Sequence, residues 1–473
     1  MSQQKKGLEV PKDRLASVDA AGSRVFIHPA AVKGFFSRWR KVVHWVLLIL
    51  FLALPWIQIG GHQAILLDIP NRNFVFFGLR LFSHDAPILF FLFAALTLGL
   101  AFVTAIWGRV WCGWGCPQTV FVDSFFRKIE EWVEGGYLER RKLDAQDMDL
   151  RKLRLKTMKW SLFLLFSFLI SHSFAAYFVG REEILQMVQA SPAENPGVFA
   201  FVMFMTAIVA FDFGWFREQF CIIVCPYGRI QSALMDIRSL AVLYDYKRGE
   251  PRKAPEVPAE QQGDCVSCFR CVNVCPTGID IRRGIQMECI ACTACIDACD
   301  EIMEKVGKPK GLIRYASEKE IESGERISRF GKRGFIYGAA TVVMLLGLTW
   351  VLIQRKPFYA AVIRSIEAPY ENLAEDLVLN RFRIHLKNHR PEAAEVRVAV
   401  NVEGVEVIMA ANPLKLSGEQ DFHQPLLLRF PSTVLAGQRQ RPIEVQLTYK
   451  TESGLEHLVV KPIALLGSAT ASP

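Results

Sequence analysis

The chain has 473 residues, enough for about three domains, and 51% of them are hydrophobic, a share that predicts membrane segments. The formal net charge is +9, but the basic residues are concentrated in loops on one side of the apolar segments. This distribution indicates membrane orientation and argues against nucleic acid as a partner.

Residues 1–41 are polar and basic, and no small-residue cleavage site follows the first apolar run. We therefore expect an uncleaved N-terminal segment that stays in the cytoplasm. Five stretches then have close to the ~20 apolar residues that a helix needs to cross a bilayer. They cover residues 42–59, 86–107, 158–179, 197–216 and 334–353, and the first four form a predicted membrane domain over residues 42–246.

The loop charges orient all five predicted helices in the same way. The loop between the first and second helices has only two basic residues, Arg72 and Arg80, and the loop between the third and fourth has only Arg181. The loop between the second and third has ten lysines and arginines within residues 109–156. The positive-inside rule then predicts a multi-pass membrane protein, in contact with lipid, with its N-terminus in the cytoplasm and its C-terminus in the periplasm.

The long basic loop contains an amphipathic stretch, residues 125–133. It fits a helix that lies on the membrane surface, and it fits an ordinary solvated helix equally well.

All twelve cysteines lie between Cys112 and Cys299, and eight of them form two runs with the same spacing, Cys-x2-Cys-x2-Cys-x3-Cys. This is the bacterial ferredoxin spacing, in which the fourth cysteine of each run ligates the cluster of the other run. We therefore predict two 4Fe-4S clusters, one held by Cys265, Cys268, Cys271 and Cys299, and the other by Cys289, Cys292, Cys295 and Cys275.

The alternatives for these eight cysteines fit less well. Structural zinc usually takes two Cys-x2-Cys pairs, and disulfides would need an oxidising compartment, which the predicted topology excludes. The two runs differ at one position, since Asp300 stands where the first run has Pro276. The ferredoxin module is expected over residues 264–310, between the fourth and fifth helices, after a proline-rich and charged linker at residues 247–263.

The other four cysteines form two matching Cys-x3-Cys-Pro motifs, each of which follows an apolar helix: Cys112 and Cys116, then Cys221 and Cys225. On a helix, positions i and i+4 share a face, and the proline after the second cysteine ends the helix there. If the two repeats pack about a pseudo-two-fold axis, four thiols meet near the membrane surface. Such a site would suit copper(I), zinc or an iron-sulfur cluster. The alternative is that these cysteines are only small buried residues at the helix ends, with no chemical role.

Other polar residues in the apolar helices are expected to be structural. His44 and His172 would lie about 18 Å apart in depth, too far to share one haem, so both are predicted to be packing or interfacial residues. Asp212 is expected to be solvated or paired with Arg217. Met203 and Met205 cannot share a helix face and are expected to lie in the core or against lipid.

Beyond Arg355 the pattern changes to alternating apolar and polar residues, at 377–386, 395–402, 425–430, 443–449 and 457–465. Such strands, separated by turn residues, predict a periplasmic domain at residues 357–473, with docking or assembly as its role. The predicted fold class is thus an α-helical membrane protein with five transmembrane helices, an inserted bacterial-type two-cluster ferredoxin module and a C-terminal all-β immunoglobulin-like sandwich.

With both cysteine sets in place, nearly the whole chain resembles the cytochrome c oxidase accessory protein family called CcoG, FixG or RdxA. The resemblance rests on the combination of five helices, two Cys-x3-Cys-Pro motifs, the ferredoxin module and the β domain. It implies that the protein is a cupric reductase, which reduces Cu(II) to Cu(I) for assembly of the cbb-type cytochrome oxidase. The resemblance implies that the eight ferredoxin cysteines are the cluster ligands. It also implies that the catalytic, copper-binding residues are Cys112, Cys116, Cys221 and Cys225.

The expected partners are a cytoplasmic electron donor, a copper exporter or chaperone that collects Cu(I), and the oxidase assembly machinery. Two alternatives stay open. The chain also resembles the membrane ferredoxins of periplasmic nitrate reductase systems, which would make it a quinol-linked electron carrier for a partner reductase. It would otherwise be a non-catalytic scaffold for oxidase assembly. The sequence leaves the oligomeric state open, including a homodimer.

Overall fold

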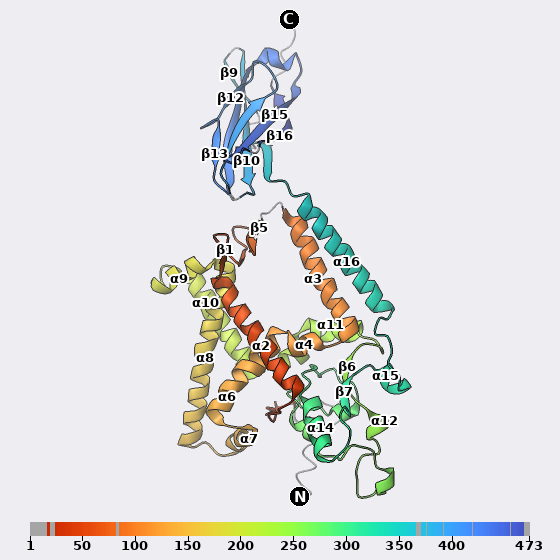
Figure 1. The fold of residues 1–473 in the computed structure, drawn as a ribbon. Helices are drawn as coiled ribbons and strands as arrows, with labels where there is room; N and C mark the ends of the chain where they lie inside the picture. Colours follow the sequence, from red (N-terminus) through yellow and green to blue (C-terminus); the bar gives the residue numbers. More distant parts are fainter. Residues whose placement is uncertain are drawn as a thin grey trace. The chain divides into compact units, whose positions relative to one another are not determined.

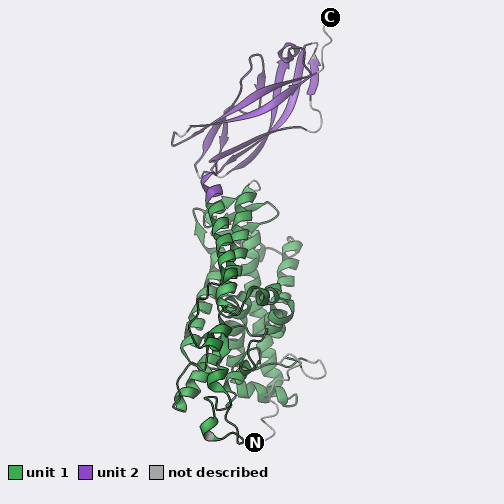
Figure 2. Cartoon of the chain, turned by 90° about the vertical axis from the view of Figure 1, so that its right-hand side faces the viewer, with its two compact units in different colours: residues 1–349 green, residues 350–473 purple. Residues whose placement is uncertain are grey.

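The computed structural model describes residues 17–18, 24–81, 85–365, 370–374, 376–390, 392–418, 420–454 and 456–467. Much of the basic N-terminal segment, residues 1–16, therefore lies outside the described residues. The chain forms two compact units, Met1–Thr349 and Trp350–Pro473, which are shown in different colours in Figure 2.

Five helices are long and apolar enough to cross a membrane, and they match the five predicted stretches. They are α2 (Phe35–Ala53, extended by the 3-10 helix η1, Leu54–Trp56), α3 (Ala86–Trp107), α8 (Leu150–Val179), α10 (Pro196–Phe211, extended by the π-helix η4, Asp212–Phe216) and α16 (Lys332–Ile353).

Two of these helices begin earlier than their apolar stretches, because their first turns are polar. The N-terminus of α8 is capped by Asp149, whose side chain accepts a hydrogen bond of 2.6 Å from the backbone N–H of Lys152. The N-terminus of α2 is capped from a distant part of the chain, since the Asp297 carboxylate accepts from the N–H groups of Phe36 and Ser37, at 3.2 and 2.6 Å. A carboxylate there also suits the positive end of the helix dipole.

Helices α3 and α16 pack side by side in antiparallel directions (Figure 1), and glycines make the close approach possible. A Cβ on Gly338 would lie 2.9 Å from the ring of Phe102, and one on Gly347 would lie 2.5 Å from the ring of Phe91. Small residues at helix contacts are typical of membrane helices, where close packing replaces the hydrophobic effect.

Helices α2, α8 and α10 enclose an aromatic core together with short helices that follow α3. The rings of Phe121 and Phe213 stack with centroids 5.2 Å apart, and those of Phe126 and Phe163 meet edge to face at 5.0 Å. The shorter helices are α4 (Val110–Trp114), α5 (Pro117–Phe121), the π-helix η3 (Val122–Phe126), α6 (Arg127–Glu134), α7 (Tyr137–Ala145), α9 (Arg181–Gln189), the π-helix η5 (Phe220–Val224) and α11 (Pro226–Leu234).

Between α2 and α3 the structure has short strands that were not predicted. They form a two-stranded and a three-stranded antiparallel sheet. Their bounds are β1 (Gln58–Ile59), β2 (His62–Gln63), β3 (Ile65–Asp68), β4 (Asn73–Phe76) and β5 (Leu79–Leu81).

The ferredoxin module is closed by two strands that flank it in sequence, since β6 (Ala241–Tyr244) pairs antiparallel with β7 (Ile313–Ala316). Its helices are α12 (Tyr246–Gly249), η6 (Ala259–Gln261), α13 (Arg270–Asn273), η7 (Ile281–Arg283), α14 (Ala294–Lys305) and α15 (Glu318–Ser323). Helix α14 continues past Cys299 because Asp300, unlike proline, is compatible with a helix interior. The side chain of Asp300 accepts a 2.8 Å hydrogen bond from the N–H of Gly311.

The second unit has two antiparallel sheets. One has the order β12-β14-β10-β8 with β9 also paired to β10, and the other has the order β13-β11-β15-β16. Alternate residues such as Ile384, Leu428 and Leu447 are fully buried in a shared core. The strands are β8 (Phe358–Arg364), β9 (Tyr370–Ala374), β10 (Leu377–Asn388), β11 (Ala394–Val400), β12 (Glu406–Ile408), β13 (Leu414–Leu416), β14 (Asp421–Pro431), β15 (Gln440–Thr451) and β16 (Glu456–Leu466), with the 3-10 helix η8 (Ser432–Leu435) after β14. All five predicted strands are present.

Candidate functional site: two cysteine-lined cavities beside paired thiols

The eight ferredoxin cysteines line two small apolar cavities. Four of them line the first, and the second is lined by the other four together with Cys271, which touches both. The fourth cysteine of each run lines the cavity of the other run. The first cavity thus contains Cys265, Cys268, Cys271 and Cys299, and the second contains Cys289, Cys292, Cys295 and Cys275, the grouping that crossed ligation requires.

The two runs share an unusual backbone conformation that places their thiols. The residues on either side of the second cysteine have positive φ in both runs: Ser267 and Phe269 at 53° and 56°, and Ala291 and Thr293 at 51° and 64°. Non-glycine residues rarely adopt this conformation, which turns the chain sharply. Repetition at matching positions gives the module internal pseudo-symmetry, in keeping with its two identical cysteine spacings.

The chemistry of these thiols fits iron-sulfur clusters. Burial raises the pKa of Cys275 and of Cys299 to about 12, and neighbouring thiols act in the same direction. Converging thiolates in an apolar cavity therefore need a cationic centre to compensate them, and four thiolates per cavity is the ligand number of a 4Fe-4S cluster.

Two arginines bind the backbone of the second run. Arg109 donates to the carbonyl oxygens of Met287 and of Cys289, the latter at 2.9 Å. Arg40, on α2, donates to the carbonyl oxygen of Cys292 at 2.8 Å and pairs with Asp123 at 2.7 Å. These contacts join the ferredoxin module to the apolar helices and place positive charge beside the second cavity, where charge and hydrogen bonds tune cluster potentials.

The first Cys-x3-Cys-Pro motif packs directly on the second ferredoxin run. A Cβ on Gly113 would lie 2.5 Å from the carbonyl oxygen of Ala291, so only glycine permits this contact. His44 is fully buried and hydrogen-bonds the carbonyl oxygen of Gly113 at 3.1 Å. Trp114 donates to the hydroxyl of Tyr315 at 3.2 Å. The motif therefore touches the loop between two predicted cluster ligands, and His44 has the packing role that the sequence predicted.

The two motifs repeat the same local structure. The preceding helices end at Gly108 and Arg217, which have nearly equal backbone angles, φ 57° and ψ −126° against φ 51° and ψ −123°. Each first cysteine follows four residues later in a short helix, and each second cysteine is extended. The prediction that the two cysteines of a motif share one helical face is therefore wrong, because the second cysteine is outside the short helix that holds the first. The proline after the second cysteine instead starts a new helix, because its fixed φ suits the first helical position.

The four thiols of these motifs, which we call the membrane-edge thiols (Cys112, Cys116, Cys221 and Cys225), are neighbours. Burial and then Cys116 raise the pKa of Cys112 to about 12, and Cys225 and Cys289 act in the same direction. Burial, Cys116 and Cys112 likewise raise the pKa of Cys221. The thiol of Cys112 also donates to Gln231, on α11, at 3.3 Å. The first motif is thus close both to the second motif and to the second cavity.

The membrane-edge thiols do not form a compact tetrahedral site in this structure. Sulfurs on one zinc ion would lie about 3.8 Å apart, given a Zn–S bond of about 2.3 Å. Among the described residues, the one set of three His, Cys, Asp or Glu side chains whose ligand atoms all lie within 4.8 Å is found in the second unit.

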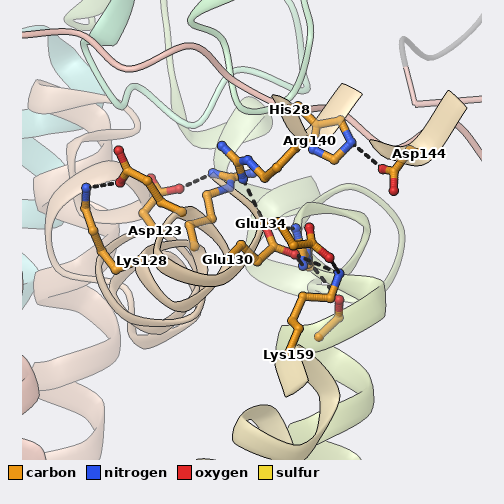
Figure 3. Close-up of polar contacts among 12 residues, drawn as sticks. His28, Asp123, Lys128, Glu130, Glu134, Arg140, Asp144 and Lys159 are labelled. Atoms are coloured by element: carbon orange, nitrogen blue, oxygen red, sulfur yellow. Dashed lines mark hydrogen bonds and ion pairs between the residues drawn. The ribbon is translucent and has the colours of Figure 1, made fainter. Parts of the chain in front are cut away.

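A buried ionic network lies beside the motifs, and Figure 3 shows much of it. Glu130, on α6, is 2% exposed and pairs with Arg217, Arg140 and Lys159. Burial raises the pKa of Glu130, but the charge of Arg217 and its neighbours outweighs that effect and lowers it to about 2. A second acid, Glu134, pairs with Lys159 at 2.9 Å.

This network changes the picture of two predicted features. The amphipathic stretch 125–133 has an exposed face with Lys128, Glu131 and Trp132, but its charged side chains Arg127 and Glu130 are buried. Arg127 pairs with Asp123 and Glu218, and Glu130 pairs with Lys159 of α8, partners that hydropathy does not reveal. Arg217 pairs with Glu130 rather than Asp212, which accepts a 3.1 Å hydrogen bond from Gln118 instead. His172 bonds the carbonyl oxygen of Phe168, in its own helix.

Comparison with known protein families gives matches to three parts of the chain. A model described as a 4Fe-4S dicluster domain matches residues 216–318, and one described as a 4Fe-4S binding domain matches residues 89–135, which include the first Cys-x3-Cys-Pro motif. A model of the immunoglobulin-like fold at the C-terminus of FixG matches residues 348–460.

Three relatives match along most of their length. Protein RdxB of Cereibacter sphaeroides is 37% identical over 83% of this chain and 85% of its own. Protein RdxA of the same organism is 34% identical over 80% and 82%. Nitrogen fixation protein FixG of Rhizobium meliloti is 37% identical over 83% and 81%. The chain therefore belongs to the FixG/RdxA family of iron-sulfur proteins.

Proposed function

We propose that this protein is a multi-pass protein of the bacterial inner membrane that reduces Cu(II) to Cu(I) for assembly of a cbb-type cytochrome oxidase. The observation that carries the proposal is the contact between the first Cys-x3-Cys-Pro motif and the second ferredoxin run, where Gly113 meets Ala291. This contact supports the proposal because it brings a motif with two thiols, which suit a soft metal ion, next to a candidate electron-transfer centre.

The predicted ligands divide between two cofactors. Cys265, Cys268, Cys271 and Cys299 would hold one 4Fe-4S cluster, and Cys289, Cys292, Cys295 and Cys275 the other. When bound, the clusters would supply one-electron transfer. Arg40 and Arg109 would hold the second run against the helices through its carbonyl oxygens.

The membrane-edge thiols are the proposed copper site. Cu(II) accepts one electron there and leaves as Cu(I), which thiolates bind better than Cu(II) because both are soft. Release then requires an acceptor such as a copper exporter or chaperone. The positive-inside distribution would place this site and the ferredoxin module at the cytoplasmic face, and the β unit in the periplasm.

The direct test is copper reduction by the purified protein with a chemical reductant, followed with a chromogenic Cu(I) chelator. The variants C112A and C221A are expected to lose most of this activity while they keep iron-sulfur absorbance. M203L is a matched control, because Met203 is a soft side chain that is 44% exposed on α10 and lies outside both motifs. Full activity in the cysteine variants would rule out the membrane-edge thiols as the copper site. Activity without iron-sulfur absorbance would rule out electron transfer through the clusters.

A second role for the membrane-edge thiols is supported by the match of a 4Fe-4S binding domain over residues 89–135 and by the spacing of the thiols. Cluster ligands bind separate irons and so lie farther apart than ligands of one ion. Iron content distinguishes the two roles, since two clusters give about eight irons per chain and a third cluster would add to that number. Loss of iron in C221A would favour the third cluster.

Quinol-linked electron transfer, a third candidate, is favoured by an apolar pocket lined by residues of α8, α9 and α10, including His172, Met187 and Val202. His172 lies 13 residues along α8 from Lys159 of the ionic network, or about 20 Å at 1.5 Å per residue. Such a pocket is remote from the cysteine sites. Rapid quinol oxidation by the purified protein without copper would support this function over cupric reduction.

A further inference from the structure

Three potential metal ligands lie together on one sheet face of the second unit. In the antiparallel pair β10–β14, His385 is directly opposite His423, and Lys387 is directly opposite Asp421. Because residues two apart on a strand point to the same side, His385, His423 and Asp421 share one face. Ile384 and Leu386, on either side of His385, are fully buried in the core, so this is the outer face of the sheet.

The ligand atoms of these three residues converge. The Nε2 atoms of His385 and His423 lie 2.6 and 3.5 Å from the same carboxylate oxygen, Oδ1 of Asp421. All three ligand atoms lie within 4.8 Å of one another, and no other set of three in the described residues does so. Ligands at about 2.0–2.2 Å from one ion are separated by roughly 3–3.5 Å, so small side-chain movements would bring the three onto a metal.

The surroundings hold the ligands in place. Nζ of Lys387, a buried side chain, lies 2.7 Å from Oδ2 of Asp421, which leaves Oδ1 directed at the imidazoles. Ligating carboxylates are commonly oriented by such a partner. The two imidazole rings stack with centroids 3.9 Å apart, and the ring of Tyr359 meets His385 edge to face at 5.9 Å.

We propose that His385, His423 and Asp421 form a binding site for a divalent transition-metal ion, with Cu(II) as the strongest-binding candidate. Two imidazoles and one carboxylate suit Cu(II), Ni(II) and Zn(II), and among these ions such sites generally bind Cu(II) most tightly. Three protein ligands leave at least one position for water, which is the pattern of an exchangeable rather than a closed structural site. The proposal does not depend on the membrane-edge thiols, which belong to the other unit.

The test is Cu(II) titration of the purified full chain, without reductant, monitored by electron paramagnetic resonance. Imidazole nitrogens split the Cu(II) signal, whereas thiolates do not, so the readout separates this site from the cysteines. We expect nitrogen-coupled Cu(II) in the wild-type chain, and a loss of about tenfold or more in affinity in H423Q and D421N. H457Q is the control, because it removes a histidine of β16 that is outside the set.

Thermal unfolding supplies a second readout that does not depend on activity. His423 is exposed, so H423Q should fold like the wild type without metal. Cu(II) should raise the unfolding temperature of the wild type and of H457Q but not that of H423Q, because binding to the folded state alone stabilises it. Equal affinity and equal nitrogen coupling in H385Q/H423Q and the wild type would overturn the proposal. Loss of Cu(I) production with an unchanged Cu(II) signal would count only against the proposed reductase function.

Discussion

Gly113 and Ala291 are in direct contact across 178 residues of sequence, since a Cβ on Gly113 would lie 2.5 Å from the carbonyl oxygen of Ala291. The contact joins a Cys-x3-Cys-Pro motif to the segment between two predicted cluster ligands. The contact therefore brings the ferredoxin module next to the thiols of the first Cys-x3-Cys-Pro motif, a proximity that neither cysteine motif indicates by itself.

Substitution G113A is expected to separate these two parts. The added methyl group collides with backbone rather than with a flexible side chain, so the motif or the loop must move. We expect copper reduction to fall about 10- to 100-fold while iron-sulfur absorbance is retained, because an ångström-scale displacement suffices to disrupt a reaction geometry. G197A is the control, since a Cβ at Gly197 meets nothing within 4 Å. Wild-type rates in G113A would show that the contact is not on the electron route.

Crossed ligation predicts which cluster each fourth cysteine serves. C299S should disturb the cluster of Cys265, Cys268 and Cys271, and C275S the cluster of Cys289, Cys292 and Cys295. Electron paramagnetic resonance of the reduced variants checks this, with each variant as the control for the other. If C299S instead altered the signal that C289S alters, ligation within each run would replace the crossed scheme.

Glu130 is expected to make the stability of the protein depend on pH. Its pKa in the folded state is about 2, below the ordinary value of 4.5. Ionised Glu130 therefore adds about 3 kcal/mol to the free energy of unfolding. This contribution is fully present above about pH 4.5 and is lost as the pH falls towards 2.

The measurement is detergent-solubilised thermal unfolding of E130Q at pH 7 and at pH 4. E130Q should be destabilised by about 3–5 kcal/mol at neutral pH, because it leaves the buried Arg217 and Arg140 without their carboxylate partner. The gap to the wild type should narrow on acidification. E131Q is the control, since the neighbouring Glu131 pairs with Lys128 on an exposed surface and should matter by less than about 1 kcal/mol. A pH-independent gap would contradict the assignment of the low pKa to Glu130.

The glycines of α16 are predicted to be essential for its packing on α3. G338L would force a side chain into the ring of Phe102 and should cost about 1–3 kcal/mol in thermal stability. A339L tests the same helix at an exposed neighbour and should be nearly neutral. Equal stability of the two variants would show that the close approach is not needed.

Sequence patterns predict the parts of this fold that depend on local spacing. Hydropathy finds the five apolar helices, cysteine spacing finds the grouping in the two cavities, and alternation finds the main strands of the second unit. Each of these patterns can be recognised within a short continuous segment of the sequence.

Features that depend on distant partners are not predictable in this way. The charges of α6 look solvated in sequence, yet Glu130 is buried because Arg217, 87 residues away, neutralises it. Gly113 looks like one glycine among 32, and only the position of Ala291 gives it a role. The outer-face histidines His385 and His423 become neighbours only through the register of β10 and β14.

The cap on α2 has a consequence for how the protein matures. Asp297 lies between Cys295 and Cys299, so the first apolar helix leaves the ribosome some 260 residues before the group that completes its N-terminus. During synthesis the N–H groups of Phe36 and Ser37 must rely on water or transient partners. The helix end acquires its final partner only when α14 has formed, the helix that also carries Cys295 and Cys299. The start of the first membrane-length helix is therefore completed by the segment that presents two predicted cluster ligands.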